Sequence, residues 1–409
     1  MSESDIVWKN YFYKNETCKE DVLKRIKFNP IAAKYCLPST PILANYNTPG
    51  GSIYACAVLE PQDTVKSLQE IMSLAMILSA NGAGVSMWFG NIRAIGSKCD
   101  DPRKEIDGIF LFIKMFEALI SAYSQGGIRK GAGVSNLPIH HPEIEKFVTL
   151  RRKTGDKDLR CSEMNIGVVI DDEFMTAVEN GTMYRLHNPK PYTDKYGEQD
   201  GEKWVDARKL FRLICACRSE TGYPFIMFDG NVKRNSTYKH VNDIKCPNLC
   251  TEVLLGTNAE HPVALCCLGT VNLYSIYLAC FDAAKVFKPL GFKEMVKYFI
   301  MYMNKYLTDL RKENPEEDYL GGHKTICKSI GIGFSGILDI YNTSPSDYTQ
   351  MVSILTEVIT ELREDGAIDK TQCSFAIAPN SYVSQLLGNV SPGIMPFPKE
   401  NYSLKMHKV

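Results

Sequence analysis

The stretch Cys246-Pro-Asn-Leu-Cys-Thr-Glu252, with the pair Cys266-Cys267 shortly after it, carries the densest chemistry in the sequence. Within it, Asn248, Cys250 and Glu252 stand at alternate positions. In an extended backbone, residues i, i+2 and i+4 point to one side, so the spacing predicts that an amide, a thiol and a carboxylate face one small volume. Together they supply a hydrogen-bond former, a redox or nucleophilic centre and a proton acceptor.

Other interpretations fit the same cysteines. A cysteine outside a disulfide often serves as a small apolar core residue, so the stretch could be a buried strand end without chemistry. Cys246, Cys250, Cys266 and Cys267 could also bind zinc, whose ligand pairs usually stand about two to four residues apart, although the adjacent pair fits that spacing poorly. The two later cysteines also offer partners for thiol–disulfide exchange.

The composition is that of an ordinary folded protein. The chain has 409 residues, of which 44% are apolar and 23% charged, enough to bury a substantial core. Basic residues number 47 and acidic residues 47, so no net positive charge marks a nucleic-acid partner. The polar N-terminus lacks a signal-peptide pattern, and the apolar stretches are shorter than the ~18 residues of a membrane helix. We therefore expect a cytoplasmic protein with mostly reduced cysteines and no membrane or nucleic-acid partner.

Strand patterns alternate with helical patterns, which predicts an α/β architecture with much parallel sheet. Asp63-Thr64 caps a helix to about Ser79, Leu37–Ala44 is predicted to be extended, and the glycine-rich Ile330–Gly336 separates two later helices. The other predicted strands are 53–59, 85–89, 164–170, 225–228 and 375–378, and the other predicted helices are 108–123, 143–150, 207–218, 292–310 and 348–363. We expect an N-terminal helical segment over residues 1–36 and one large domain over residues 37–409.

Two loops have features of phosphate sites. Gly126–Gly131 contains Arg129 and Lys130, and its backbone amides and positive charge suit phosphates, but a tight turn with solvated charges fits equally well. The hydroxyls of Pro379–Ser384 suit either a diphosphate at a helix N-terminus or a simple helix cap. Four other side chains capable of metal or redox chemistry are interpreted as structural: His140, His141, Cys215 and Cys217.

Taken together and in order, the motifs resemble the catalytic (large, alpha) subunit of ribonucleotide reductase, of the class I and class II type, from about Pro38 to Pro396. The most specific motif is Asn248-Leu-Cys-Thr-Glu252. The shorter matches are Ser39-Thr40-Pro41, Cys56 in Tyr-Ala-Cys-Ala-Val-Leu, Asn81-Gly-Ala-Gly84, Ile92–Ser97, Arg129–Ala132, His141–Ile144, Cys266 in Leu-Cys-Cys-Leu-Gly-Thr-Val-Asn-Leu, and Ala378–Met395. The resemblance implies a ten-stranded α/β barrel with the strongest motif on a central finger loop, incomplete at its C-terminal end.

The resemblance implies an oxidoreductase that converts ribonucleotides, diphosphates in our expectation, to deoxyribonucleotides by thiyl-radical chemistry. Cys250 would become the thiyl radical and take the 3′ hydrogen of the substrate. Glu252 would accept the 3′-hydroxyl proton, and Asn248 would hydrogen-bond to the substrate.

A redox pair is implied as well. Cys56 and Cys266 would protonate the leaving 2′-hydroxyl and supply two electrons, ending as a disulfide. Cys267 is an alternative to Cys266, which the register against the family favours. The residues implied to bind substrate are Thr40, Ala55, Gly84, Arg160, Ser381, Tyr382 and Ser384.

Allosteric control follows from the same resemblance. A deoxynucleotide or ATP effector would bind at the interface of a homodimer, with Asp63 on its sugar and Arg93 near its phosphates. The charged loop Arg152–Cys161 would relay the identity of the effector to the substrate base, with Arg160 on the substrate side.

No cofactor would bind this chain directly. The radical would come from a di-metal small subunit in class I or from adenosylcobalamin in class II, and a thioredoxin- or glutaredoxin-type reductant would renew the thiols. The chain ends at Val409, and Met395 and Asn380 depart from the family pattern. We therefore expect a split or truncated subunit, completed by a C-terminal fragment or second polypeptide, as in a phage or viral genome acting in host cytoplasm. The alternatives are a catalytically incompetent nucleotide-binding regulator and a glycyl-radical-type enzyme on the same barrel.

Overall fold

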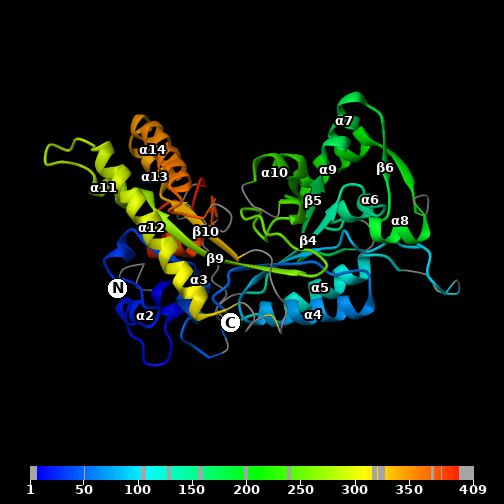
Figure 1. Cartoon of the computed structure of the whole chain (residues 1–409), viewed down its shortest axis with the longest axis horizontal. Helices are drawn as coiled ribbons and strands as arrows, with labels where there is room; N and C mark the ends of the chain where they lie inside the picture. The colour runs from blue at the N-terminus through cyan, green and yellow to red at the C-terminus, as the bar shows by residue number, and fades with distance from the viewer. Residues whose placement is uncertain are drawn as a thin grey trace.

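A curled nine-stranded sheet is the centre of the molecule in a computed structural model of the chain (Figure 1). The structure describes residues 7–49, 51–101, 103, 107–126, 130–154, 160–197, 201–236, 241–315, 320, 328–369, 373–378 and 380–395. The sheet order is β11-β10-β9-β2-β3-β4-β5-β8, and β1 also pairs with β9. The strands are β1 (Cys36–Pro38), β2 (Cys56–Leu59), β3 (Gly84–Trp88), β4 (Gly133–Pro138), β5 (Asn165–Ile170), β8 (Phe225–Phe228), β9 (Val263–Asn272), β10 (Lys328–Ser335) and β11 (Cys373–Ala376).

Strand β9 joins two parallel half-sheets. On one side, β2, β3, β4, β5 and β8 run parallel to one another. On the other, β9, β10 and β11 run parallel, and β2 meets β9 antiparallel. The ten residues of β9 are almost all buried, as expected of a strand covered on both faces. The predicted α/β fold class with a mostly parallel sheet is confirmed.

Helices supply the crossovers that parallel strands require. The helices are α2 (Lys19–Arg25), α3 (Thr40–Asn45), α4 (Val65–Ala80), α5 (Phe110–Ala122), α6 (Ile144–Val148), α7 (Asp172–Asn180), α8 (Lys190–Tyr196), α9 (Ala207–Thr221), α10 (Asp229–Asn235), α11 (Leu273–Ala279), α12 (Pro289–Glu313), α13 (Ile337–Thr343), α14 (Pro345–Glu364) and α15 (Ser381–Leu386). Helices α4 and α5 pack on β3 and β4, and α12 packs on β9 and β10. Figure 1 shows α12, α13 and α14 at one end of the sheet and α7, α8 and α9 at the other. Across the described ranges, no helix has both the length and the apolarity to cross a bilayer.

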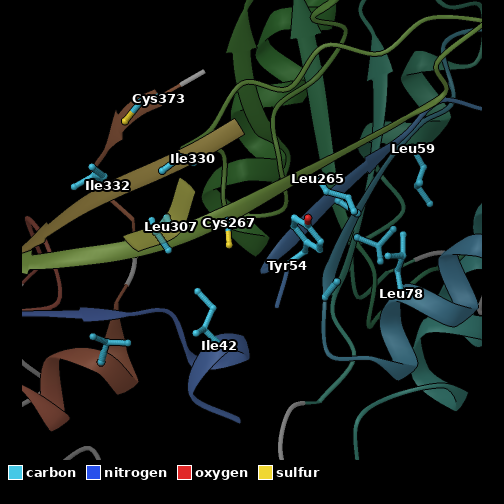
Figure 2. Packing of buried hydrophobic residues seen from close by; sticks show 14 of the residues in the cluster. Ile42, Tyr54, Leu59, Leu78, Leu265, Cys267, Leu307, Ile330, Ile332 and Cys373 are labelled. Carbon is cyan, nitrogen blue, oxygen red and sulfur yellow. The ribbon is translucent and has the colours of Figure 1, made fainter. Parts of the chain in front are cut away.

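The two faces of the sheet belong to different cores. Leu265 and Cys267 of β9 point into the main core, between sheet and helices, with Ile42 and Ile330 (Figure 2). The opposite face carries a smaller group that we call the inner cluster. Its members are Ala55, Cys56, Val58, Trp88, Val169, Met227, Cys246, Val253, Leu255, Ala264, Cys266 and Ala376. Because side chains alternate along a strand, the adjacent Cys266 and Cys267 of β9 lie on opposite faces of the sheet.

Several predicted elements match the structure closely. The predicted helix after Asp63-Thr64 is α4, and the Thr64 hydroxyl accepts a hydrogen bond from the Ser67 amide at 3.2 Å. The predicted strand over residues 225–228 is β8. The glycine-rich Ile330–Gly336, predicted only to separate two helices, is mostly strand β10.

The extended prediction for Leu37–Ala44 is wrong in its second half. Only Cys36–Pro38 is a strand, and Thr40–Asn45 forms α3. Pro41 stands in the first helical turn, where its missing N–H costs nothing because that group has no partner in the helix. The proline therefore begins a helix here and does not prolong an extended segment.

Candidate active site

The signature stretch forms a tight hairpin turn, so the extended backbone predicted for Asn248–Glu252 is wrong. Pro247 and Leu254 form an antiparallel bridge, and the Asn248 amide donates to the Val253 carbonyl at 3.0 Å. The Thr251 amide closes the turn on the Asn248 carbonyl at 3.1 Å, and Thr251 has a φ of 64°. A reversal of the chain, and not strand alternation, therefore arranges these side chains. We call residues 247–254 the finger turn.

Asn248 ties the finger turn together and joins it to the sheet. Its side-chain oxygen accepts hydrogen bonds from the amides of Glu252 and Val253, both at 3.0 Å. Its side-chain nitrogen donates to the sulfur of Cys56 at 3.2 Å. The side chain is fully buried, where an amide is stable only if its polar atoms are paired. One amide thus sets the shape of the turn and its place beside a thiol of β2.

Cys56 lies directly opposite Cys266 in the antiparallel pairing of β2 with β9. Opposed residues in such a pair have Cα atoms about 4.5–5.5 Å apart, within the range of roughly 4.4–6.8 Å that a disulfide spans. The two thiols are in hydrogen-bond contact, and this contact together with burial raises the pKa of Cys266 well above its usual value. Cys266 therefore stays protonated while reduced, and strand register holds the two thiols where a disulfide can form.

Cys267 belongs to the other face of β9. It is fully buried in the main core, where its thiol faces the Ile53 carbonyl at 3.9 Å. Figure 2 shows it among Tyr54, Leu265 and other apolar side chains. The geometry favours Cys266 over Cys267 as the partner of Cys56.

Cys250 and Glu252 offer the reactive groups of the finger turn. Cys250 is exposed at the tip. Glu252 is half-buried, and among the described residues its Oε2 has no hydrogen-bond partner. Burial raises the pKa of the Glu252 carboxyl, although its hydrogen bond with Asn248 acts in the opposite direction. An unpaired carboxylate oxygen of raised basicity is suited to accept a proton.

Two of the predicted substrate residues lie under the finger turn. The Gly84 amide donates to the Ala55 carbonyl at 2.9 Å, which places both beside Cys56. A Cβ at Gly84 would lie 2.6 Å from Cδ2 of Leu249. The absent side chain of Gly84 thus makes room for the finger turn.

The predicted phosphate-binding residues lie at the starts of two short helices. Thr40 begins α3, and Ser381 begins α15, with Tyr382 next to it and exposed. Ser384 is buried, and its hydroxyl donates to the Ser381 carbonyl at 3.0 Å. Pro379 and residues 127–129 of the other predicted phosphate loop lie outside the described residues.

The predicted effector residues contact each other. Nε of Arg93 and Oδ2 of Asp63 form an ion pair 2.5 Å long beside the start of α4, and the Arg93 guanidinium lies over the Tyr192 ring, 5.3 Å from its centre. Arg160 is half-buried and precedes Cys161, far along the chain from this pair. Residues 155–159 of its loop lie outside the described part.

The zinc interpretation finds no support within the described ranges, where no group of three or more His, Cys, Asp or Glu side chains is arranged to hold a metal ion. Cys215 is exposed and Cys217 is buried, as expected for different faces of a helix. His141 is buried, and its ring accepts the Glu143 amide at 3.2 Å and donates to the Ile92 carbonyl at 2.9 Å.

Two fully buried polar residues behind the finger turn, Ser86 and Asn136, belong to none of the sequence motifs. The Ser86 hydroxyl donates to the Pro247 carbonyl at 2.8 Å, and the Asn136 amide donates to the Ser86 hydroxyl at 2.9 Å. Their signal in the sequence was weak: Ser86 is one polar residue in an apolar strand, and Asn136 directly follows Ser135 in another.

Comparison with known proteins identifies one family and several relatives. Residues 54–368 match the family model described as ribonucleotide reductase, barrel domain. The chain is 29% identical to the ribonucleoside-diphosphate reductase subunit alpha of Bacillus subtilis over 58% of this chain and 38% of that protein. It is 27% identical to the subunit alpha of Chlamydia muridarum over 90% of this chain and 36% of that protein. It is also 27% identical to the large subunit from Trypanosoma brucei brucei over 78% of this chain and 39% of that protein. The chain thus spans less than half the length of these relatives.

Proposed function

Because the chain belongs to the ribonucleotide reductase family through its barrel domain, we propose that it provides the catalytic centre of a ribonucleoside-diphosphate reductase. The observation that carries the proposal is the pairing of Cys56 with Cys266, with Asn248 linking Cys56 to the turn that bears Cys250 and Glu252. Two thiols in disulfide register supply the electrons, and a third thiol on an exposed tip is accessible to substrate.

The first half of the reaction takes place on the finger turn. Cys250, after losing a hydrogen atom to the radical source, would take the 3′ hydrogen of the ribonucleotide. Glu252 would accept the 3′-hydroxyl proton on its unpartnered oxygen, and the raised pKa of this carboxyl favours holding that proton. The Asn248 side-chain amide would hydrogen-bond to the substrate hydroxyls. To do so it must give up one of its present hydrogen bonds, which go to Cys56, Glu252 and Val253.

The second half uses the redox pair. Cys56 and Cys266 together give up two protons and two electrons, the 2′-hydroxyl leaves as water, and the two sulfurs form one disulfide bond. One of the two protons leaves in the water, and the other, with the two electrons, forms the new C–H bond at the 2′ carbon. Cys250 then returns its hydrogen atom to the 3′ carbon, which restores the radical, and Glu252 returns its proton to the 3′ oxygen. The raised pKa of Cys266 keeps its proton available for the leaving hydroxyl.

Other groups are assigned by the same proposal. Thr40, Ser381, Tyr382 and Ser384 would bind the diphosphate. Asp63 and Arg93 would bind a deoxynucleotide or ATP effector in a homodimer, and Arg160 would contact the substrate. A di-metal small subunit or adenosylcobalamin would supply the one-electron oxidation of Cys250, whose exposure fits that access. A thioredoxin- or glutaredoxin-type protein would reduce the disulfide again. We propose that a second polypeptide supplies the remaining elements of the barrel.

Reconstitution tests the proposal. The reduced chain is mixed with a radical generator, dithiothreitol, the completing polypeptide and labelled CDP, and dCDP is measured. We expect product only in the complete mixture, none with Cys250→Ser, and product with Cys267→Ser, whose thiol lies on the other face of β9. Normal turnover by the 409-residue chain without a second polypeptide would refute the split arrangement. Nucleotide binding without reduction in any mixture would favour a regulatory homologue.

A further inference from the structure

We propose that Ser86 and Asn136 are positioning residues that fix the finger turn, and with it Cys250, relative to the redox pair. The inference rests on the proposed function for its catalytic meaning, but the anchoring itself can be measured without turnover. It concerns two polar side chains in the middle of the sheet, on β3 and β4.

The Ser86 hydroxyl has every bond that a hydroxyl can make. It donates its one proton to the Pro247 carbonyl at 2.8 Å and accepts from the Asn136 amide at 2.9 Å. The thiol of Cys246 lies 3.7 Å away and, since the hydroxyl proton is already used, acts as the donor. A hydroxyl has one donor and two acceptor positions, so this set is complete. Two of the three partners are the residues directly before Asn248.

Asn136 packs in turn against β5. It is 1% exposed, and the space for its side chain exists because Gly167 faces it: a Cβ on Gly167 would overlap the Asn136 side-chain oxygen. A buried polar side chain costs stability unless it is bonded, and an apolar residue would serve the sheet as well. We therefore infer that the contacts from Gly167 through Asn136 to Ser86 serve to position the finger turn.

The position of the finger turn matters because the turn carries Cys250 and contacts the redox pair. Pro247 precedes Asn248, whose side chain reaches Cys56 at 3.2 Å. The finger turn is thus attached to β3 through a backbone carbonyl and to β2 through a thiol. Neighbouring strands in a sheet form a rigid frame, and reactions between groups on separate elements depend steeply on their placement. Without the Ser86 attachment, the turn that carries Cys250 would keep only the Asn248–Cys56 hydrogen bond and the packing of Leu249 over Gly84.

The first measurement is amide hydrogen exchange on the whole 409-residue chain. Ser86→Ala leaves the Pro247 carbonyl without its donor, so we expect amides of Asn248–Val253 to exchange about fivefold faster or more, the factor for about 1 kcal/mol of lost anchoring. The internal reference is β9, whose exchange should not change. The matched control is Ser135→Ala, because Ser135 is equally buried on β4 and its hydroxyl has no partner among the described residues.

The second measurement is turnover in the reconstituted enzyme. Ser86→Ala should lower kcat and leave the KM for nucleotide unchanged, because the anchor holds the reacting thiol and not the diphosphate. If Ser86→Ala does not fold, Asn136→Ala is compared with Ser135→Ala, since it removes one support of the hydroxyl and keeps the bond to Pro247. Unchanged exchange in the finger turn, or faster exchange with normal kcat, overturns the inference. An inactive wild type would count against the proposed function only, because exchange still decides the anchor.

Discussion

At the scale of single residues, the direction of one side chain separates Cys266 from Cys267. The two are adjacent, apolar in character and fully buried. Cys266 shares the inner face with Cys56, whereas Cys267 packs in the main core. A thiol exchanges only with a sulfur that it can reach. The face of the strand on which a cysteine lies therefore decides its disulfide partner, and its position in the sequence does not.

Mild oxidation of the chain with diamide should therefore yield a Cys56–Cys266 disulfide. Peptide mapping under non-reducing conditions measures it. Cys266→Ser should abolish the cross-link, and the control Cys267→Ser should leave it at the wild-type level. A Cys56–Cys267 cross-link in the wild type would contradict the register of β2 with β9.

His141 illustrates how burial sets a charge state. Burial, together with the neighbouring His140 and His187, lowers the pKa of His141 to about 4, against the opposing effect of the hydrogen bond to Ile92. Its Nδ1 accepts the Glu143 amide, so protonation there would break that bond. The folded chain thus holds this histidine neutral.

The free energy of unfolding should consequently fall as pH decreases from about 6.5, the value for an unfolded histidine, to about 4. The sign follows because the unfolded state binds the proton first, and the loss from this one group amounts to about 3 kcal/mol. Urea denaturation at several pH values measures it. His141→Gln removes the titrating group, so the difference in unfolding free energy between wild type and variant should change with pH over this range. A difference that does not change with pH would show that another group is responsible.

At the scale of elements, the finger turn depends on the strands beneath it. Leu249 occupies the space above Gly84, Asn248 reaches Cys56, and the Pro247 carbonyl is bonded by Ser86. Each contact crosses from the turn to β2 or β3. The position of the turn is therefore a property of the sheet and the turn together.

Gly84→Ala should push Leu249 outward, because the new Cβ would lie 2.6 Å from Cδ2 of Leu249. We expect a loss of about 1–3 kcal/mol in unfolding free energy, the usual cost of overpacking, and reduced turnover. Chemical denaturation and dCDP formation measure the two effects. The control is Gly291→Ala in the first turn of α12, where the nearest atoms to a Cβ are 4.0 Å away. Equal unfolding free energies for the two variants would contradict the prediction, because they would show that Leu249 can move away from the new Cβ without cost.

At the scale of the whole molecule, the sheet has two ends. Within the described residues, β11 pairs only with β10, and β8 pairs only with β5. Unpaired strand edges attract further strands. The relatives are more than twice as long as the region matched here. Both facts suit the proposal that a second polypeptide pairs with these edges.

Binding of that polypeptide should slow amide exchange in β8 and β11, because their free backbone groups would gain partners. It should also raise the melting temperature, since a ligand that binds only the folded state stabilises it. Exchange in β3, which is paired on both edges, serves as the internal control. Protection confined to helices, with β8 and β11 unchanged, would argue against closure of the barrel.

The sequence by itself determined the elements whose signals are local. The helix after Thr64 and the strand Phe225–Phe228 were predictable because caps and apolar periodicity act within a few residues. The family, and the residues Cys250 and Glu252 as candidates, followed from an ordered set of short motifs. Residue type and chain order were enough for these conclusions.

Only the tertiary structure decided how the site is assembled. The finger turn looked extended in sequence because alternation was the only local pattern, whereas its actual shape depends on the bonds from Asn248 to Glu252 and Val253. The opposition of Cys56 and Cys266 depends on a strand pairing across 210 residues of chain. Such pairings are set by packing and register over the whole sheet, which no local pattern specifies.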